Sequence, residues 1–68
     1  MDREDAVALL KELGTRQLIQ PSLVLIEKRN NDSYQLKIKG NYYLESVEAF
    51  LSSRGFSYEE NKEYLVIF

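Results

Sequence analysis

Carboxylates are the side chains of this 68-residue chain that could do acid–base chemistry, because it has no histidine and no cysteine. Without histidine there is no ordinary general base near neutral pH, and without cysteine there is no thiolate nucleophile. The candidate sets of carboxylates are Glu45 with Glu48, and Glu59 and Glu60 with Glu63. Carboxylates at such spacings are usually solvated charge, and the usual zinc ligands are lacking. The sequence therefore predicts a protein that is not an enzyme and that holds no metal or cofactor.

Aromatic and basic side chains offer binding rather than catalysis. Tyr42 and Tyr43 could stack on a ligand or a base, or could divide between the core and its rim. Lys37 and Lys39 alternate with apolar residues and are the candidate nucleic-acid contacts. The net charge of −2 argues against a general nucleic-acid or membrane binder, because such binding draws most of its affinity from basic charge. The charge is nevertheless uneven, since residues 15–41 are net basic and both flanking segments are net acidic.

Length and composition predict one soluble domain over residues 1–68. The apolar content of 44% and the charged content of 29% are ordinary for a globular protein. No apolar run approaches the roughly 20 residues that a membrane span needs. The acidic stretch from Asp2 to Asp5 is unlike the start of a signal peptide, so the sequence predicts a cytoplasmic location. A core this small supplies modest stability, and association with a partner is the remaining way to add to it.

The first half of the chain predicts one helix and one hairpin. Asp2 is a good N-cap, apolar residues recur at helical spacing over residues 2–13, and Gly14 fits the left-handed position that ends a helix. After a connector, residues 22–29 predict a strand that starts apolar on both faces. Residues 33–39 predict a strand that alternates apolar with polar residues. The asparagine-rich turn between these strands makes them a hairpin.

The second half repeats this order. Gly40 breaks the strand, and Asn41 is the predicted N-cap of a helix over residues 42–54. Residues 56–59 and 63–68 predict a second hairpin. The order αββαββ predicts an α+β fold, in which one four-stranded, mostly antiparallel sheet carries both helices on one face. This order matches a circular permutation of the ferredoxin-like βαββαβ arrangement, with the first strand moved to the end.

The last strand, residues 63–68, is apolar without a break from Tyr64 to Phe68. Such a run implies cover on both faces, but two helices on one side of the sheet cannot supply it. A two-residue turn before this strand points Tyr64, Val66 and Phe68 away from the helices. We therefore expect an open apolar face on the sheet.

The first hairpin leaves two alternatives for this open face. An even-numbered loop points Val24 and Ile26 outward, whereas an odd-numbered loop exposes Leu23 and Leu25 instead. Two doubly apolar strands are best placed side by side, so residues 22–29 are expected beside the last strand. A connector that folds over part of this face is an alternative. The predicted interface consists of Val24, Ile26, Tyr64, Val66 and Phe68.

Two hypotheses for function follow. The first is a small protein-interaction or regulatory module that forms a homodimer, or binds a protein partner, through the open apolar face. The second is a single-stranded nucleic-acid-binding module, in which strand 33–39 is the neighbour of the last strand. Such a sheet would resemble the aromatic and basic surface of RNA-recognition modules. Its outward residues would be Gln35, Lys37, Lys39, Tyr64 and Phe68.

Overall fold

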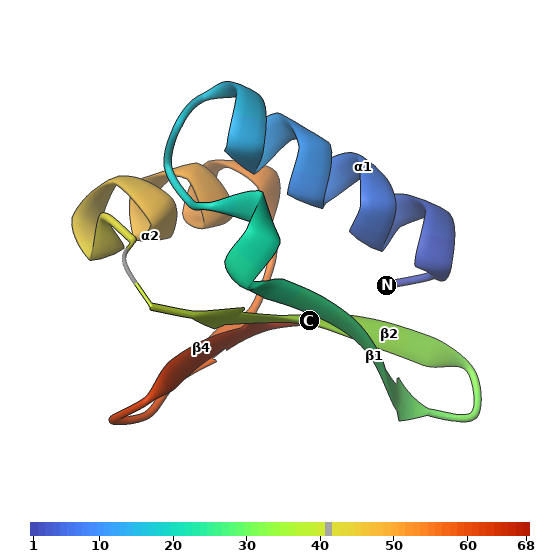
Figure 1. The fold of residues 1–68 in the computed structure, drawn as a ribbon. Coiled ribbons are helices and arrows are strands. Elements are labelled where there is room, and N and C mark those ends of the chain that lie inside the picture. The colour runs from blue at the N-terminus through green and yellow to red at the C-terminus, as the bar shows by residue number, and fades with distance from the viewer. Residues whose placement is uncertain (41) are drawn as a thin grey trace.

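Two helices cover the same face of a four-stranded sheet in the computed structural model (Figure 1). The structure describes residues 1–40 and 42–68, so the predicted N-cap Asn41 lies outside the described residues. The order αββαββ and the predicted α+β fold are confirmed. The elements are α1 (Arg3–Thr15), the short 3-10 turn η1 (Pro21–Leu23), β1 (Val24–Asn30), β2 (Ser33–Lys39), α2 (Leu44–Arg54), β3 (Tyr58–Glu60) and β4 (Tyr64–Ile67).

The strands follow the order β1-β2-β4-β3, and all neighbours are antiparallel. β2, not β1, therefore lies beside β4, and the expectation that the two doubly apolar strands are neighbours is wrong. This is the strand order that the circularly permuted ferredoxin-like arrangement requires. β1 is apolar at its start for another reason. It is an edge strand whose Val24 and Ile26 pack against the core while Leu25 remains exposed.

A bulge in the first hairpin decides which residues of β1 face the helices. The loop between Asn30 and Ser33 has two residues, but the pairing shifts by one at Arg29. One extra residue in a strand moves all residues beyond it to the other face of the sheet. The outward orientation expected for Val24 and Ile26 is therefore wrong, because these side chains lie on the helix face opposite Ile38 and Leu36. The exposed apolar residues are instead Leu23 and Leu25.

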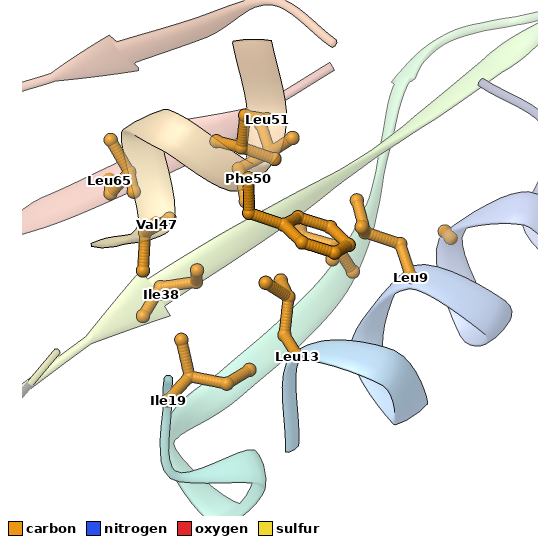
Figure 2. Packing of buried hydrophobic residues seen from close by; sticks show 11 residues of the cluster. Leu9, Leu13, Ile19, Ile38, Val47, Phe50, Leu51 and Leu65 are labelled. Carbon is orange, nitrogen blue, oxygen red and sulfur yellow. The ribbon is translucent and has the colours of Figure 1, made fainter. Parts of the chain in front are cut away.

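The core fills the space between the sheet and the two helices (Figure 2). β2 and β4 each contribute two side chains that are fully buried. The connector after α1 adds Ile19 to this core and runs on the helix side of the sheet (Figure 1), so it does not cover the other face. The buried residues are Ala6, Leu9, Leu13, Ile19, Leu36, Ile38, Val47, Phe50, Leu51, Leu65 and Ile67.

The two helices end in the same way but on different residue types. α2 ends at Gly55, which has a left-handed φ of 77°, as its glycine predicts. α1 continues past Gly14, and Gln17 takes the left-handed conformation with φ of 58°. The Leu18 amide donates to the Leu13 carbonyl at 3.0 Å, as in a Schellman motif. The terminating role predicted for Gly14 is therefore wrong. Gly14 instead allows close packing, since a Cβ there would lie 2.8 Å from Pro21 Cγ.

Candidate functional site

The face of the sheet that carries no helix is called the open face here, and strand pairing determines which residues lie on it. Lys37 of β2 pairs with Leu25 of β1 and with Val66 of β4, and residues paired across strands share a face. The alternation along each strand places the others. The outward side chains are Leu25 and Glu27 on β1, Gln35, Lys37 and Lys39 on β2, Tyr64, Val66 and Phe68 on and just after β4, and Glu59 on β3.

Tyr64, Val66 and Phe68 lie on the open face, as predicted, yet each is half-buried. Since both helices pack on the opposite face, this partial cover comes from neighbouring side chains of the sheet. Lys37 and Arg29 contribute to it directly. Lys37 Nζ lies 4.1 Å from the centroid of the Tyr64 ring, and the Arg29 guanidinium carbon lies 3.6 Å from that of Phe68. The two aromatic rings of β4 thus each carry a cation from the first hairpin.

Arg29 reaches Phe68 across the width of the sheet and is held by two further contacts. Its Nη1 donates to Gln35 Oε1 at 3.2 Å, and its Nη2 lies 3.8 Å from Glu59 Oε1. Its position follows from the bulge, because Arg29 is the extra residue between Lys28 and Asn30. Sequence reasoning missed this residue as part of the site. The charged run before the turn marks it as basic, but no local signal places the bulge.

The charge of the open face is mixed, with its cations gathered toward the middle of the sheet. Lys37 and Lys39 stand on β2, which is a central strand, and Arg29 extends toward β4. The acidic side chains, Glu27 and Glu59, belong to the two edge strands. Cationic and aromatic groups therefore lie side by side in the middle of this face, flanked by one carboxylate at each side.

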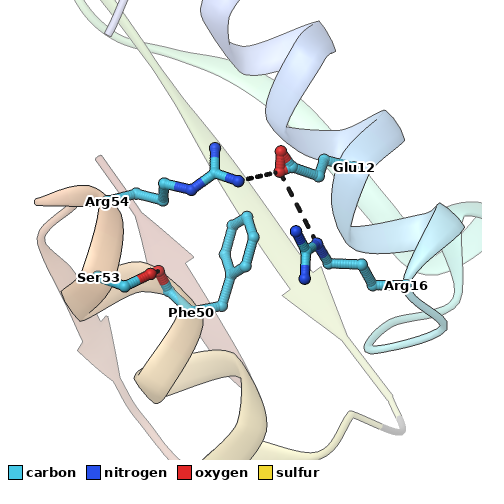
Figure 3. A network of polar contacts seen from close by, with 5 residues as sticks. All are labelled: Glu12, Arg16, Phe50, Ser53 and Arg54. Atoms are coloured by element: carbon cyan, nitrogen blue, oxygen red, sulfur yellow. Dashed lines mark hydrogen bonds and ion pairs between the residues drawn. The ribbon is translucent and has the colours of Figure 1, made fainter.

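A second cation–aromatic cluster lies on the helix side of the molecule (Figure 3). Arg16 and Arg54 place their guanidinium carbons 5.1 and 4.8 Å from the centroid of the Phe50 ring. Glu12 Oε2 lies 2.9 Å from Arg54 Nη2 and 3.9 Å from Arg16 Nε. Ser53 Oγ donates to the Phe50 carbonyl at 2.7 Å. This cluster ties the end of α1 to α2 through one carboxylate shared by two guanidinium groups, so it serves the fold.

The carboxylates considered for chemistry are not brought together. Among residues 1–40 and 42–68, no group of three or more acidic residues is placed to hold a metal ion. Partial burial, followed by the charge and hydrogen bonding of the Glu60 carboxylate, raises the pKa of Tyr42 above its usual value. Tyr42 Oη donates to Glu60 Oε2 at 3.4 Å, near the rim of the core. The Tyr42–Glu60 contact does not have the geometry of an acid–base pair that faces a substrate.

The helices in the described part of the chain are too short and too polar to cross a membrane. Comparison with protein-family models, with curated proteins and with solved structures finds no match. The proposals for function therefore rest on the geometry of the open face and of the helix layer.

Proposed function

We propose that this chain is a small non-catalytic binding module whose open face binds single-stranded nucleic acid. The observation that supports this proposal most directly is that β2 lies beside β4. This strand order brings the cations Lys37 and Lys39 alongside Tyr64 and the strand that ends at Phe68. Aromatic rings for base stacking and cations for the phosphates are the two components that single-strand-binding surfaces combine.

The spacing of the rings suits an extended strand. Tyr64 and Phe68 are four residues apart on one face, which corresponds to about 13 Å along the sheet. Val66 lies between them and offers an apolar surface to the sugar of an intervening nucleotide. The open face therefore has room for two stacked bases with a bridging nucleotide between them.

Binding requires that Lys37 and Arg29 leave the rings that they now cover. A cation–aromatic contact at an exposed site contributes about 0.5–1 kcal/mol, whereas stacking of a base on an aromatic side chain contributes about 1–3 kcal/mol. A displaced Lys37 or Arg29 also becomes available to a phosphate. The exchange therefore favours the bound state. The flanking carboxylates Glu27 and Glu59 weaken it, so we expect modest affinity.

The salt dependence of binding tests the proposal. Three phosphate contacts, from Arg29, Lys37 and Lys39, predict that the logarithm of the association constant falls with that of salt concentration with a slope of roughly −2. Fluorescence anisotropy of a labelled single-stranded RNA measures this slope. Lys37→Gln should reduce the slope by about 0.7. Lys11→Gln, an equal charge change on α1, is the matched control and should leave binding unchanged.

Tyr64→Leu separates stacking from charge. Loss of one ring should weaken binding by a factor of about 5 to 100, at every salt concentration, without changing the slope. If the native chain fails to bind single-stranded RNA and DNA even at low salt, the proposal is wrong. It is equally wrong if Lys11→Gln weakens binding as much as Lys37→Gln does.

A second candidate function is self-association or binding of a protein partner through the same face. It is favoured by the exposure of Leu25, 47% of whose surface is accessible, next to the mixed surface around Val66. Light scattering over a concentration series should then give twice the 8.0 kDa mass of the chain. Val66→Glu should restore the single-chain mass, because it places a charge at the centre of the interface. If the native protein has the mass of a single chain at high concentration, the homodimer hypothesis is wrong.

A further inference from the structure

A concave surface lies on the helix side of the molecule, away from the open face. A cleft of about 560 Å³ is lined by the connector after α1 on one side and by the residues that lead into α2 on the other. This volume lies within the range of small-molecule sites. The described residues that line it are uncharged. Its walls include Gln17, Leu18, Ile19, Gln20, Tyr42 and Tyr43.

The two walls of this cleft are joined through the backbone. Ile19 and Tyr42 form an isolated antiparallel bridge, and the Tyr43 amide donates to the Leu18 carbonyl at 3.4 Å. Ile19 is part of the buried core, and Tyr42 packs against it. The floor of the cleft is thus anchored in the core, and its shape is present before any ligand arrives.

Tyr43 occupies a position where another residue would stabilise the fold more. Its side chain is 70% exposed, and it is the N-cap residue of α2 without a side-chain hydrogen bond to the helix. Serine, threonine, aspartate or asparagine at an N-cap stabilises a helix relative to residues that cannot cap it. An exposed aromatic ring at this position therefore contributes little to the stability of α2.

Gln17, on the opposite wall, is also unfavourable for the fold. Its φ of 58° is the left-handed conformation that the Schellman motif requires, and glycine is the usual residue there. A residue with a Cβ is strained in this conformation. Strained residues that persist often mark ligand sites. Gln17 and Tyr43 face the same cleft, and each replaces a residue type that would make the chain more stable.

We propose that this cleft binds a neutral planar heterocycle of nucleobase size, stacked on Tyr43 and hydrogen-bonded to Gln17 and Gln20. A glutamine amide offers both a donor and an acceptor, which matches the edge of a nucleobase. The lack of charge among the described lining residues favours a neutral ring over a phosphate as the anchoring group. The ligand is either a free nucleoside or a base of a strand that also contacts the open face; only the second source rests on the proposed function.

Titration of the ¹⁵N-labelled chain with adenosine and with uridine tests this proposal. At millimolar nucleoside, we expect chemical-shift changes at the side-chain amides of Gln17 and Gln20 and at the Tyr43 backbone amide. Gln17→Gly and Tyr43→Ser should each weaken nucleoside binding about tenfold, which is the loss expected for one hydrogen bond or one stacked ring. The side-chain amide signal of Gln20 reports binding in both variants. Both changes are expected to relieve an unfavourable position, and the ¹⁵N spectrum of each variant shows directly whether it is folded.

Lys37→Gln separates the two ligand sources. Nucleoside binding should be unchanged in this variant, because Lys37 lies on the open face. If a short RNA shifts the Gln17 and Gln20 amides in the native chain, and a higher RNA concentration is needed in Lys37→Gln, the ligand is a base of the bound strand. If only nucleosides shift them, the ligand is the free nucleoside. The proposal is overturned if neither nucleosides nor the RNA shift these amides, or if the shifts persist in both Gln17→Gly and Tyr43→Ser.

Discussion

The two halves of the molecule, residues 1–40 and 42–68, build the same αββ unit with opposite chemistry on the open face. Toward the helices they are alike, since β2 buries Leu36 and Ile38 and β4 buries Leu65 and Ile67. Away from the helices the first half supplies cations and the second half supplies aromatic rings. Packing against the helices constrains one face of each strand, and the other face is free to differ.

The halves also differ at their edges and helix ends. The edge strand β1 has seven residues, whereas β3 has three. α1 has a capped start and a strained end, and α2 has an uncapped start and a relaxed end. Neither unit is therefore optimal on its own. On the open face, Tyr64 and Phe68 of the second half are each covered by a cation of the first, so the two units are joined there as well as through the core.

Truncation of core side chains should lower the unfolding free energy most, and by a similar amount in both halves. Leu36→Ala and Leu65→Ala each remove a fully buried side chain and should cost about 2–5 kcal/mol of unfolding free energy. Lys37→Ala and Val66→Ala, their neighbours on the open face, should cost about 1 kcal/mol or less. Urea denaturation followed by circular dichroism measures these differences. A cost for Lys37→Ala similar to that of Leu36→Ala would mean that the two faces do not differ as described.

The helix ends should respond with opposite signs. Gly55→Ala forces a Cβ into the left-handed conformation and should lower the unfolding free energy by about 1–2 kcal/mol. Gln17→Gly removes a Cβ from the same conformation and should raise it by about 0.5–1 kcal/mol, since the added freedom of glycine in the unfolded chain offsets part of the gain. Thermal denaturation of both variants gives the signs directly. Destabilisation by Gln17→Gly would contradict the assignment of strain to α1.

The helix starts should show the smallest effects of this comparison. The Asp5 amide donates to Asp2 Oδ1 at 2.7 Å, so Asp2→Ala should lower the unfolding free energy by about 1 kcal/mol. Tyr43→Ser introduces a capping hydroxyl at the start of α2 and should raise it by about 0.5–1 kcal/mol. The urea concentrations at the midpoint of unfolding measure both changes, provided that the dependence of the unfolding free energy on urea concentration is the same in each variant. If Tyr43→Ser is destabilising, the ring has a structural role that its exposure does not suggest.

Patterns within single elements predicted the architecture well. Alternation in β2, the apolar run of β4 and the capping Asp2 each depend on neighbouring residues in the chain, and the structure has them as expected. The outward orientation of Tyr64, Val66 and Phe68 followed from one short turn, in which Asn61 Oδ1 accepts from the amides of Glu63 and Tyr64.

Features that depend on more than one element were not predictable in this way. The bulge at Arg29 reversed the orientation of Val24 and Ile26, because one unpaired residue changes the parity of a whole strand. Strand order depends on how helices cross the sheet, and an apolar edge strand looks like a central one in sequence. Gly14 resembled a helix terminator, but its contact with Pro21 arises only once the connector folds back.

The edge of β1 has a consequence for the behaviour of the protein at high concentration. Its first half, Val24 to Ile26, is apolar and could accept an added strand from another molecule, which is the usual beginning of fibril growth. The bulge at Arg29 interrupts the ladder after a few residues, and the charges around it discourage close approach. The bulge at position 29 therefore limits the length of the regular edge, while the Arg29 side chain reaches the other way and covers Phe68.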